Sequence, residues 1–184
     1  MKPIFTIHAG EYLVGSYIEE NYKELNVWIP SKDTGIDLLV TDSINSTTVS
    51  LQVKFSKDFL ITHGKKEYQS KFLSWGWWTF NREKIRASPA DYWVMVMHTF
   101  NDKNMHYVII EPKELSRRMN VIHPTAKSLQ TYLWVTSSKK CWETRGLKKK
   151  DQVLVANDLY SNKDRDFSGY LNNWHPIEEK FKIS

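Results

Sequence analysis

The sequence predicts a mixed fold of helices and strands, α/β in the α+β sense, built around a central sheet. Apolar residues recur at three-to-four spacing over residues 8–22, which is typical of an amphipathic helix. Residues 49–55 alternate strictly between apolar and polar, which indicates a strand with two different faces. The apolar run at 92–99 indicates a buried central strand.

The remaining elements follow in order along the chain. A short strand at 26–29 ends before Pro30, and residues 31–35 form a turn. An apolar run at 36–40 then pairs with residues 49–55 as a hairpin. Residues 65–87 are expected to contain a helix, although Ser-Trp-Gly-Trp-Trp at 74–78 interrupts its pattern. Further expected elements are strands at 106–110 and 132–135, a helix at 112–119, and a helix capped by Asp166 that contains Phe167, Tyr170, Leu171 and Trp174. Because no repeat or linker divides the chain, a single domain over residues 1–184 is expected.

Composition favours a polyanionic partner and an intracellular location. Lys and Arg outnumber Asp and Glu by 26 to 21, which gives a formal charge of +5. The only cysteine is Cys141, so no intrachain disulfide is possible and a reducing, cytoplasmic compartment is expected. Apolar runs are too short for a signal peptide or a membrane span, which predicts a soluble protein. The six His residues form no zinc pattern, and no Gly-rich phosphate loop is present.

The predicted hairpin gathers polar side chains that carry chemistry. If residues 43–46 form its loop, the register places Asp37 opposite Gln52 and Gly35 opposite Lys54. Gln52 and Lys54 then share a face with Asp37. Glu11 lies at the edge of the apolar stripe of the first helix, so its carboxylate is expected to point towards the sheet. Oxygen ligands of this kind suit Mg²⁺, and an adjacent lysine stabilises charge that develops on a phosphate.

These residues resemble a known superfamily. The segments Gly35-Ile36-Asp37 and Leu51-Gln52-Val53-Lys54, preceded by a helix with Gly10-Glu11, are similar to the PD-(D/E)XK nucleases. The Gln-x-Lys version resembles Mrr-like restriction nucleases and some intron-encoded homing endonucleases. Ile36 stands where the superfamily name places Pro, and Gln52 replaces an acid, which leaves less negative charge for a metal.

The resemblance implies a restriction-endonuclease-like fold, with a central mixed sheet flanked by helices. It implies a Mg²⁺-dependent endonuclease, with Mn²⁺ as a substitute, that hydrolyses phosphodiester bonds in DNA. Asp37 would be the main metal ligand and Glu11 a supporting ligand, while Gln52 and the Val53 carbonyl complete the metal shell. Lys54 would be the catalytic lysine. Since such a domain holds one active site, cutting both strands requires a homodimer or a larger assembly.

Candidates for nucleic-acid contact lie beyond this motif, and each has a structural alternative. Basic and aromatic side chains of the right type are Lys57, Trp77, Trp78, Arg82, Lys84 and Arg86. The tryptophans fit core packing equally well, and basic pairs are more often solvated surface. Asp33 is a further potential metal ligand, although a role in the turn is favoured. Two other functions stay open: a nucleic-acid-binding module of this fold without catalysis, and a protein-interaction domain with a Trp-rich surface.

Overall fold

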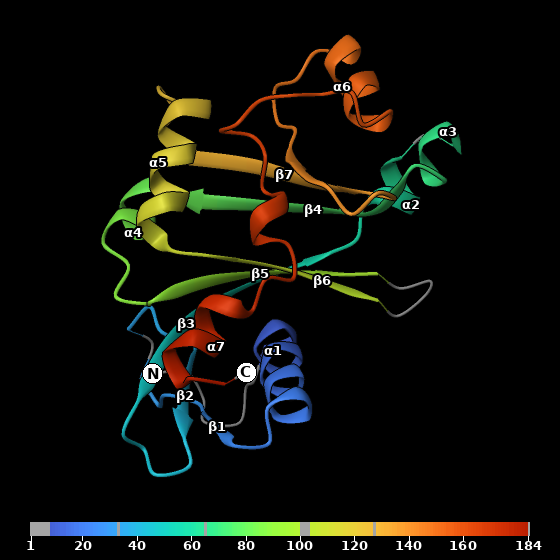
Figure 1. Cartoon of the computed structure of the whole chain (residues 1–184). Helices are drawn as coiled ribbons and strands as arrows, with labels where there is room; N and C mark the ends of the chain where they lie inside the picture. The colour runs from blue at the N-terminus through green and yellow to red at the C-terminus, as the bar shows by residue number, and fades with distance from the viewer. Residues whose placement is uncertain (1–7, 33, 65, 100–103, 127, 184) are drawn as a thin grey trace.

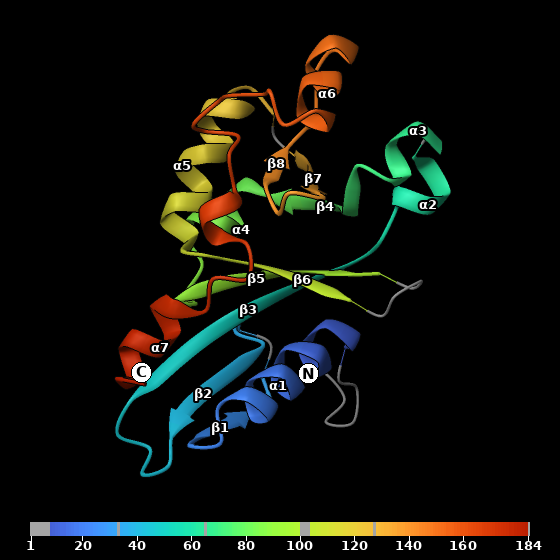
Figure 2. The same cartoon turned by 45° about the vertical axis from the view of Figure 1, so that its right-hand side comes forward.

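The computed structural model describes residues 8–32, 34–64, 66–99, 104–126 and 128–183, and the position of Asp33 lies outside them. The described residues form a mixed α and β fold, as predicted, with two sheets and flanking helices (Figures 1 and 2). The elements are α1 (Ala9–Asn21), β1 (Leu25–Trp28), β2 (Leu38–Asp42), β3 (Thr48–Lys57), α2 (Leu60–His63), α3 (Lys66–Gln69), β4 (Phe72–Asn81), α4 (Arg82–Arg86), β5 (Tyr92–His98), β6 (Met105–Ile110), α5 (Pro112–Ile122), β7 (Ser128–Thr136), β8 (Cys141–Glu143), α6 (Lys149–Ala156), the 3₁₀ turn η1 (Ser168–Tyr170) and α7 (His175–Phe181).

The larger sheet is mixed and carries the predicted hairpin. Among the described residues its strand order is β1-β2-β3-β5-β6, in which β3 and β5 are parallel and the other neighbours antiparallel. Leu38 pairs with Leu51, which confirms the predicted register. The ladder begins at Leu38, however, so Gly35 does not pair with Lys54. Asp37 lies just before β2, and its N–H donates to the Leu51 carbonyl at 2.8 Å.

Two apolar layers cover the faces of this sheet. On one face, Val14 and Ile18 of α1 pack with Leu51 and Val53 of β3 and with Trp174, beside α7. On the other face, the smaller sheet and α5 pack over β5 and β6 (Figure 1). The strict alternation of β3 therefore reflects two different neighbours: apolar side chains meet α1, while Gln52 and Lys54 point to the opposite face.

Residues 65–87, predicted to contain a helix with an interruption at 74–78, hold a short helix on each side of a long strand. The four-residue α3 precedes the ten-residue β4, and the five-residue α4 follows it; β4 pairs with β7 in a smaller antiparallel sheet of order β4-β7-β8. Aromatic residues favour strands because their rings pack against cross-strand neighbours. The pairing of Trp75 with Trp134 and of Trp77 with Tyr132 explains why the segment that interrupts the helical pattern is a strand.

The C-terminal third also departs from the prediction. The Asp166 carboxylate accepts from the Ser168 N–H at 2.9 Å, but the element that begins at Ser168 is the three-residue turn η1 and not a longer helix. The helix at this end, α7, begins only at His175. Strand β8 and helix α6 were not predicted, whereas α1, β1, β6, α5 and β7 lie where strands and helices were expected.

Cys141 is buried, and burial raises the pKa of its thiol, so the thiol stays protonated and unreactive. Within the described ranges, no helix is both long and apolar enough to span a bilayer.

A buried carboxylate holds the smaller sheet to the C-terminal segment. Glu143 is fully buried, and its Oε2 lies 2.6 Å from Nη1 of Arg165. Its Oε1 accepts from the backbone N–H of Arg145 at 3.1 Å. We expect Glu143→Ala to lower the free energy of unfolding by about 3–5 kcal/mol, because Arg165 loses its anion in a buried setting. Urea unfolding measures this. Glu143→Gln keeps an acceptor and should cost less, and equal costs for the two variants would contradict the account.

Candidate functional site

The candidate site forms where β3 extends beyond β2. Strand β3 continues to Lys57, but its pairing with β2 ends at Leu51, so Asp37 reaches the open edge of β3. Its Oδ2 accepts from the Val53 N–H at 2.8 Å and from the side-chain amide of Gln52. Asp37 and Gln52 are both buried. The predicted meeting of Asp37 with Gln52 is therefore present in the structure.

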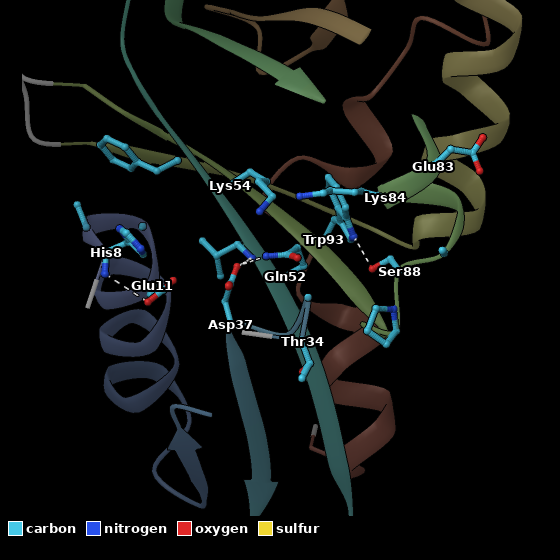
Figure 3. A pocket seen from close by; sticks show the side chains of 17 residues that line it. His8, Glu11, Thr34, Asp37, Gln52, Lys54, Glu83, Lys84, Ser88 and Trp93 are labelled. Carbon is cyan, nitrogen blue, oxygen red and sulfur yellow. Dashed lines mark hydrogen bonds between the residues drawn. The ribbon is translucent and has the colours of Figure 1, made fainter. Parts of the chain in front are cut away.

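Helix α1 brings Glu11 to the same place through a close contact with β3. A Cβ added at Gly10 would lie 2.8 Å from the Cβ of Phe55 and 3.1 Å from Cγ1 of Val53, so only glycine permits this approach. Glu11, the next residue, is buried, and its Oε2 accepts from the His8 N–H at 3.2 Å. Figure 3 shows Glu11 and Asp37 on facing elements of one pocket. The inward orientation predicted for Glu11 is confirmed.

Two lysines approach from the other side. The Nζ of Lys54 lies 5.5 Å from the ring centroid of Trp93, which holds a cation over an aromatic face. The indole N–H of Trp93 donates to Oγ of Ser88 at 2.8 Å, so the ring is fixed from behind. Lys84 of α4 extends into the pocket from the opposite wall, and its ammonium group points towards Lys54, whereas Glu83 points away (Figure 3).

All of these groups line one pocket of about 950 Å³. Its lining includes the five residues predicted as catalytic or metal-binding, namely Glu11, Asp37, Gln52, Val53 and Lys54. Gly35 has a φ of +87°, and a Cβ there would lie 3.3 Å from Cδ of Pro89. This left-handed glycine lets the loop before β2 approach the loop before β5, which closes one side of the pocket.

The oxygen donors suit a hard divalent cation. Two buried carboxylates face the pocket, and no cluster of three or more His, Cys, Asp or Glu side chains occurs in the part of the chain that the structure describes. The carbonyl and the N–H of Val53 point to the same edge of β3, and the Asp37 carboxylate accepts that N–H. Gln52 now directs its amide nitrogen to Asp37, and rotation by 180° would present its oxygen instead. Two carboxylates and two neutral oxygens, with waters, form a suitable set for Mg²⁺.

The predicted nucleic-acid contacts separate into two groups. Lys84 lines the pocket, and Lys57, Arg86 and Trp77 are surface side chains, Trp77 with 44% of its area exposed. Arg86 forms an ion pair of 2.6 Å with Glu83. These four remain accessible to a ligand.

Trp78 and Arg82 have structural roles that correct the prediction. Trp78 is only 6% exposed, belongs to the core between the sheets, and donates its indole N–H to the Lys54 carbonyl at 3.2 Å. Its ring is therefore not available to stack on a base. The guanidinium of Arg82 donates to the carbonyl of Ala126 at 3.0 Å and also contacts Asn120. These bonds tie α4 to the end of α5.

Sequence reasoning missed Trp93 and Ser88, which hold Lys54 in place. Trp93 pairs with Gln52 in the parallel ladder, so it reaches the pocket face of the sheet. The run at 92–99 is apolar on both faces, so alternation could not show which of its side chains face the pocket.

Comparisons of the chain with protein-family models, with curated proteins and with solved structures find no match.

Proposed function

We propose that the protein is a Mg²⁺-dependent endonuclease that hydrolyses phosphodiester bonds in DNA. The observation that carries the proposal is the convergence of Asp37, Gln52 and the Val53 backbone at the open edge of β3, with Glu11 and Lys54 in the same pocket. Carboxylates, an amide and a lysine in this arrangement agree with the resemblance of the sequence to PD-(D/E)XK nucleases.

The carboxylates would hold the cation, and Gln52 would contribute its amide oxygen after rotation. When bound, Mg²⁺ would lower the pKa of a water molecule and neutralise charge on the phosphate. The Asp37 carboxylate is held in a fixed position by the Val53 N–H, so it is already oriented to bind a cation. Glu11, fixed at the start of α1, would supply the second negative charge from the opposite side.

Lys54 would act on the phosphate and on the water. In hydrolysis a water oxygen forms a bond to phosphorus while the bond to the leaving sugar oxygen breaks, and negative charge builds on the phosphoryl oxygens. The Lys54 ammonium, held over Trp93, would stabilise that charge and orient the water. Lys84, which points into the same pocket, would bind a phosphate beside the one that reacts (Figure 3).

A non-catalytic DNA-binding module is the second candidate, and one observation favours it. Gln52 stands where an acid would add negative charge, and its amide hydrogen occupies the Asp37 oxygen. A module that never binds metal would keep this bond permanently. Metal dependence separates the two candidates, because binding without catalysis should be unaffected by Mg²⁺. A homodimer or larger assembly would still be needed for a nuclease to cut both strands.

Cleavage of supercoiled DNA tests the proposal. We expect the protein to nick a mixture of supercoiled plasmids in Mg²⁺ or Mn²⁺, and EDTA to stop the reaction. A mixture of many sequences is used because the enzyme would require its own recognition site. Salt-sensitive DNA binding with no cleavage under any metal condition would overturn the nuclease and support the binding module. Absence of both would favour a protein-interaction domain.

A further inference from the structure

A second pocket lies on the outer face of the smaller sheet. It has a volume of about 350 Å³ and is lined by Phe59, His63, Trp75, Gly76, Trp77, Tyr132 and Trp134. Trp75 and Trp77 lie on one face of β4, and Trp78 lies on the other face, where its indole N–H contacts the Lys54 carbonyl of β3. The pocket therefore opens on the side of β4 away from the core between the two sheets, where Trp75 and Trp134 belong to a separate buried cluster.

The rings in this pocket form an ordered aromatic surface. Trp75 and Trp134 pair across the strands and stack with centroids 4.1 Å apart at 6°. Trp77 and Tyr132 form the next pair, edge to face at 6.0 Å. Trp75 and Trp134 are each 8% exposed, whereas Trp77 is 44% exposed. The stacked pair thus forms the base of the pocket, and Trp77 is an accessible wall.

Cations flank the aromatic surface. The Nζ of Lys57 lies 5.3 Å from the ring centroid of Phe59, and Cζ of Arg145 lies 5.3 Å from that of Tyr132. Both cationic residues are exposed, and none of the seven lining residues is acidic. Aromatic rings with flanking positive charge are complementary to a nucleobase attached to a phosphate backbone.

We propose that this pocket binds one unstacked base of a single-stranded nucleic-acid segment, with Lys57 and Arg145 at the adjoining phosphates. The base stacks on Trp77, against the edge-to-face array of Phe59 and Tyr132. The inference rests on the proposed function and deepens it, because the substrate of the candidate site would then be a nucleic acid with a locally unpaired strand. One stacked base contributes about 5- to 100-fold in affinity.

Strand β3 connects the two pockets. Lys54 faces the candidate active site, and Lys57 lies beside the aromatic pocket, three residues or about 10 Å further along β3 and on its opposite face. The Trp77 N–H donates to Oγ of Ser56 at 2.9 Å, so the aromatic wall is attached to the same strand. A nucleic-acid strand bound at Lys57 would therefore lie about 10 Å along β3 from Lys54 and would have to cross from one face of β3 to the other to reach it.

Binding to strands with and without bases tests the inference. The probes are a fluorescein-labelled single-stranded oligonucleotide and an abasic strand with the same number of phosphates, titrated in EDTA. We expect the wild type to bind the base-bearing strand about 5- to 100-fold more tightly than the abasic one. Trp77→Ala should remove this preference and Trp77→Phe should keep most of it. Trp28→Ala, a matched change at another exposed tryptophan (52% exposed) on β1, should have no effect.

The outcomes separate this pocket from the candidate active site. Equal affinity for the two strands, or equal weakening of both by Trp77→Ala, would overturn the base pocket, and metal-dependent cleavage by the wild type would then leave the nuclease proposal standing. Base-dependent binding that requires Trp77 supports the pocket even if no cleavage is found. Arg145→Ala should weaken both strands and reduce the slope of log affinity against log salt by about 1.

Discussion

Asp37→Asn is expected to abolish metal-dependent cleavage, with a loss of at least about 100-fold. The change removes one of two buried carboxylates that face the pocket. The amide of asparagine retains an oxygen that can accept the Val53 N–H, so local structure should be largely preserved. The loss would therefore come from charge and not from misfolding.

Asp58→Asn is the matched control for this change. Asp58 is also buried, and its carboxylate accepts from the backbone N–H groups of Leu60 and Trp75, outside the candidate site. We expect this variant to lose some stability in urea unfolding while its cleavage rate per folded molecule stays near that of the wild type. Cleavage that survives Asp37→Asn, or that falls equally in both variants, would contradict the assigned role of Asp37.

Lys54→Ala is expected to lower the cleavage rate by about 100- to 1,000-fold without lowering metal affinity. The side chain lines the same pocket as the candidate metal ligands, and Trp93 fixes its position. Because Lys54 contributes no oxygen to a metal, its loss removes no metal ligand, and the lower rate would come from the reaction step. Single-turnover cleavage at saturating DNA measures the effect without a contribution from binding.

Two further variants complete the test: Lys54→Arg separates geometry from charge, and Lys23→Ala is a control. Lys54→Arg keeps the positive charge but places a larger planar group over Trp93, so we expect partial activity at best. Lys23→Ala removes an exposed lysine at the end of α1, where its Nζ contacts the Glu19 carbonyl, and should leave cleavage unchanged. If Lys54→Ala cleaves as fast as Lys23→Ala, Lys54 has no part in the reaction.

Much of the first third of the fold could be predicted because its local patterns agree with its tertiary neighbours. The alternation of residues 49–55 predicted both the strand and the face of Gln52 and Lys54, and the hairpin loop length gave the register that β2 and β3 adopt. Glu11 was placed by helical spacing alone, and it is buried and lines the same pocket as Asp37.

The rest depended on contacts between distant segments. Residues 72–81 form a strand because β7, more than fifty residues later, supplies the aromatic partners of Trp75 and Trp77. Trp78 and Arg82 resembled ligand-binding residues in the sequence, but their partners are the Lys54 carbonyl and the end of α5. Trp93 lies in a strand that is buried on both faces, so only the fold shows that it supports Lys54.

Binding of Mn²⁺, measured by electron paramagnetic resonance, would show whether Glu11 and Asp37 hold a divalent cation beside Lys54. The measurement needs no DNA and therefore no knowledge of the recognition sequence. We expect one Mn²⁺ per chain, displaced by Mg²⁺, with affinity lowered at least about 10-fold by Glu11→Gln and further by Asp37→Asn. No bound Mn²⁺, or equal binding by the wild type and Asp37→Asn, would contradict this expectation.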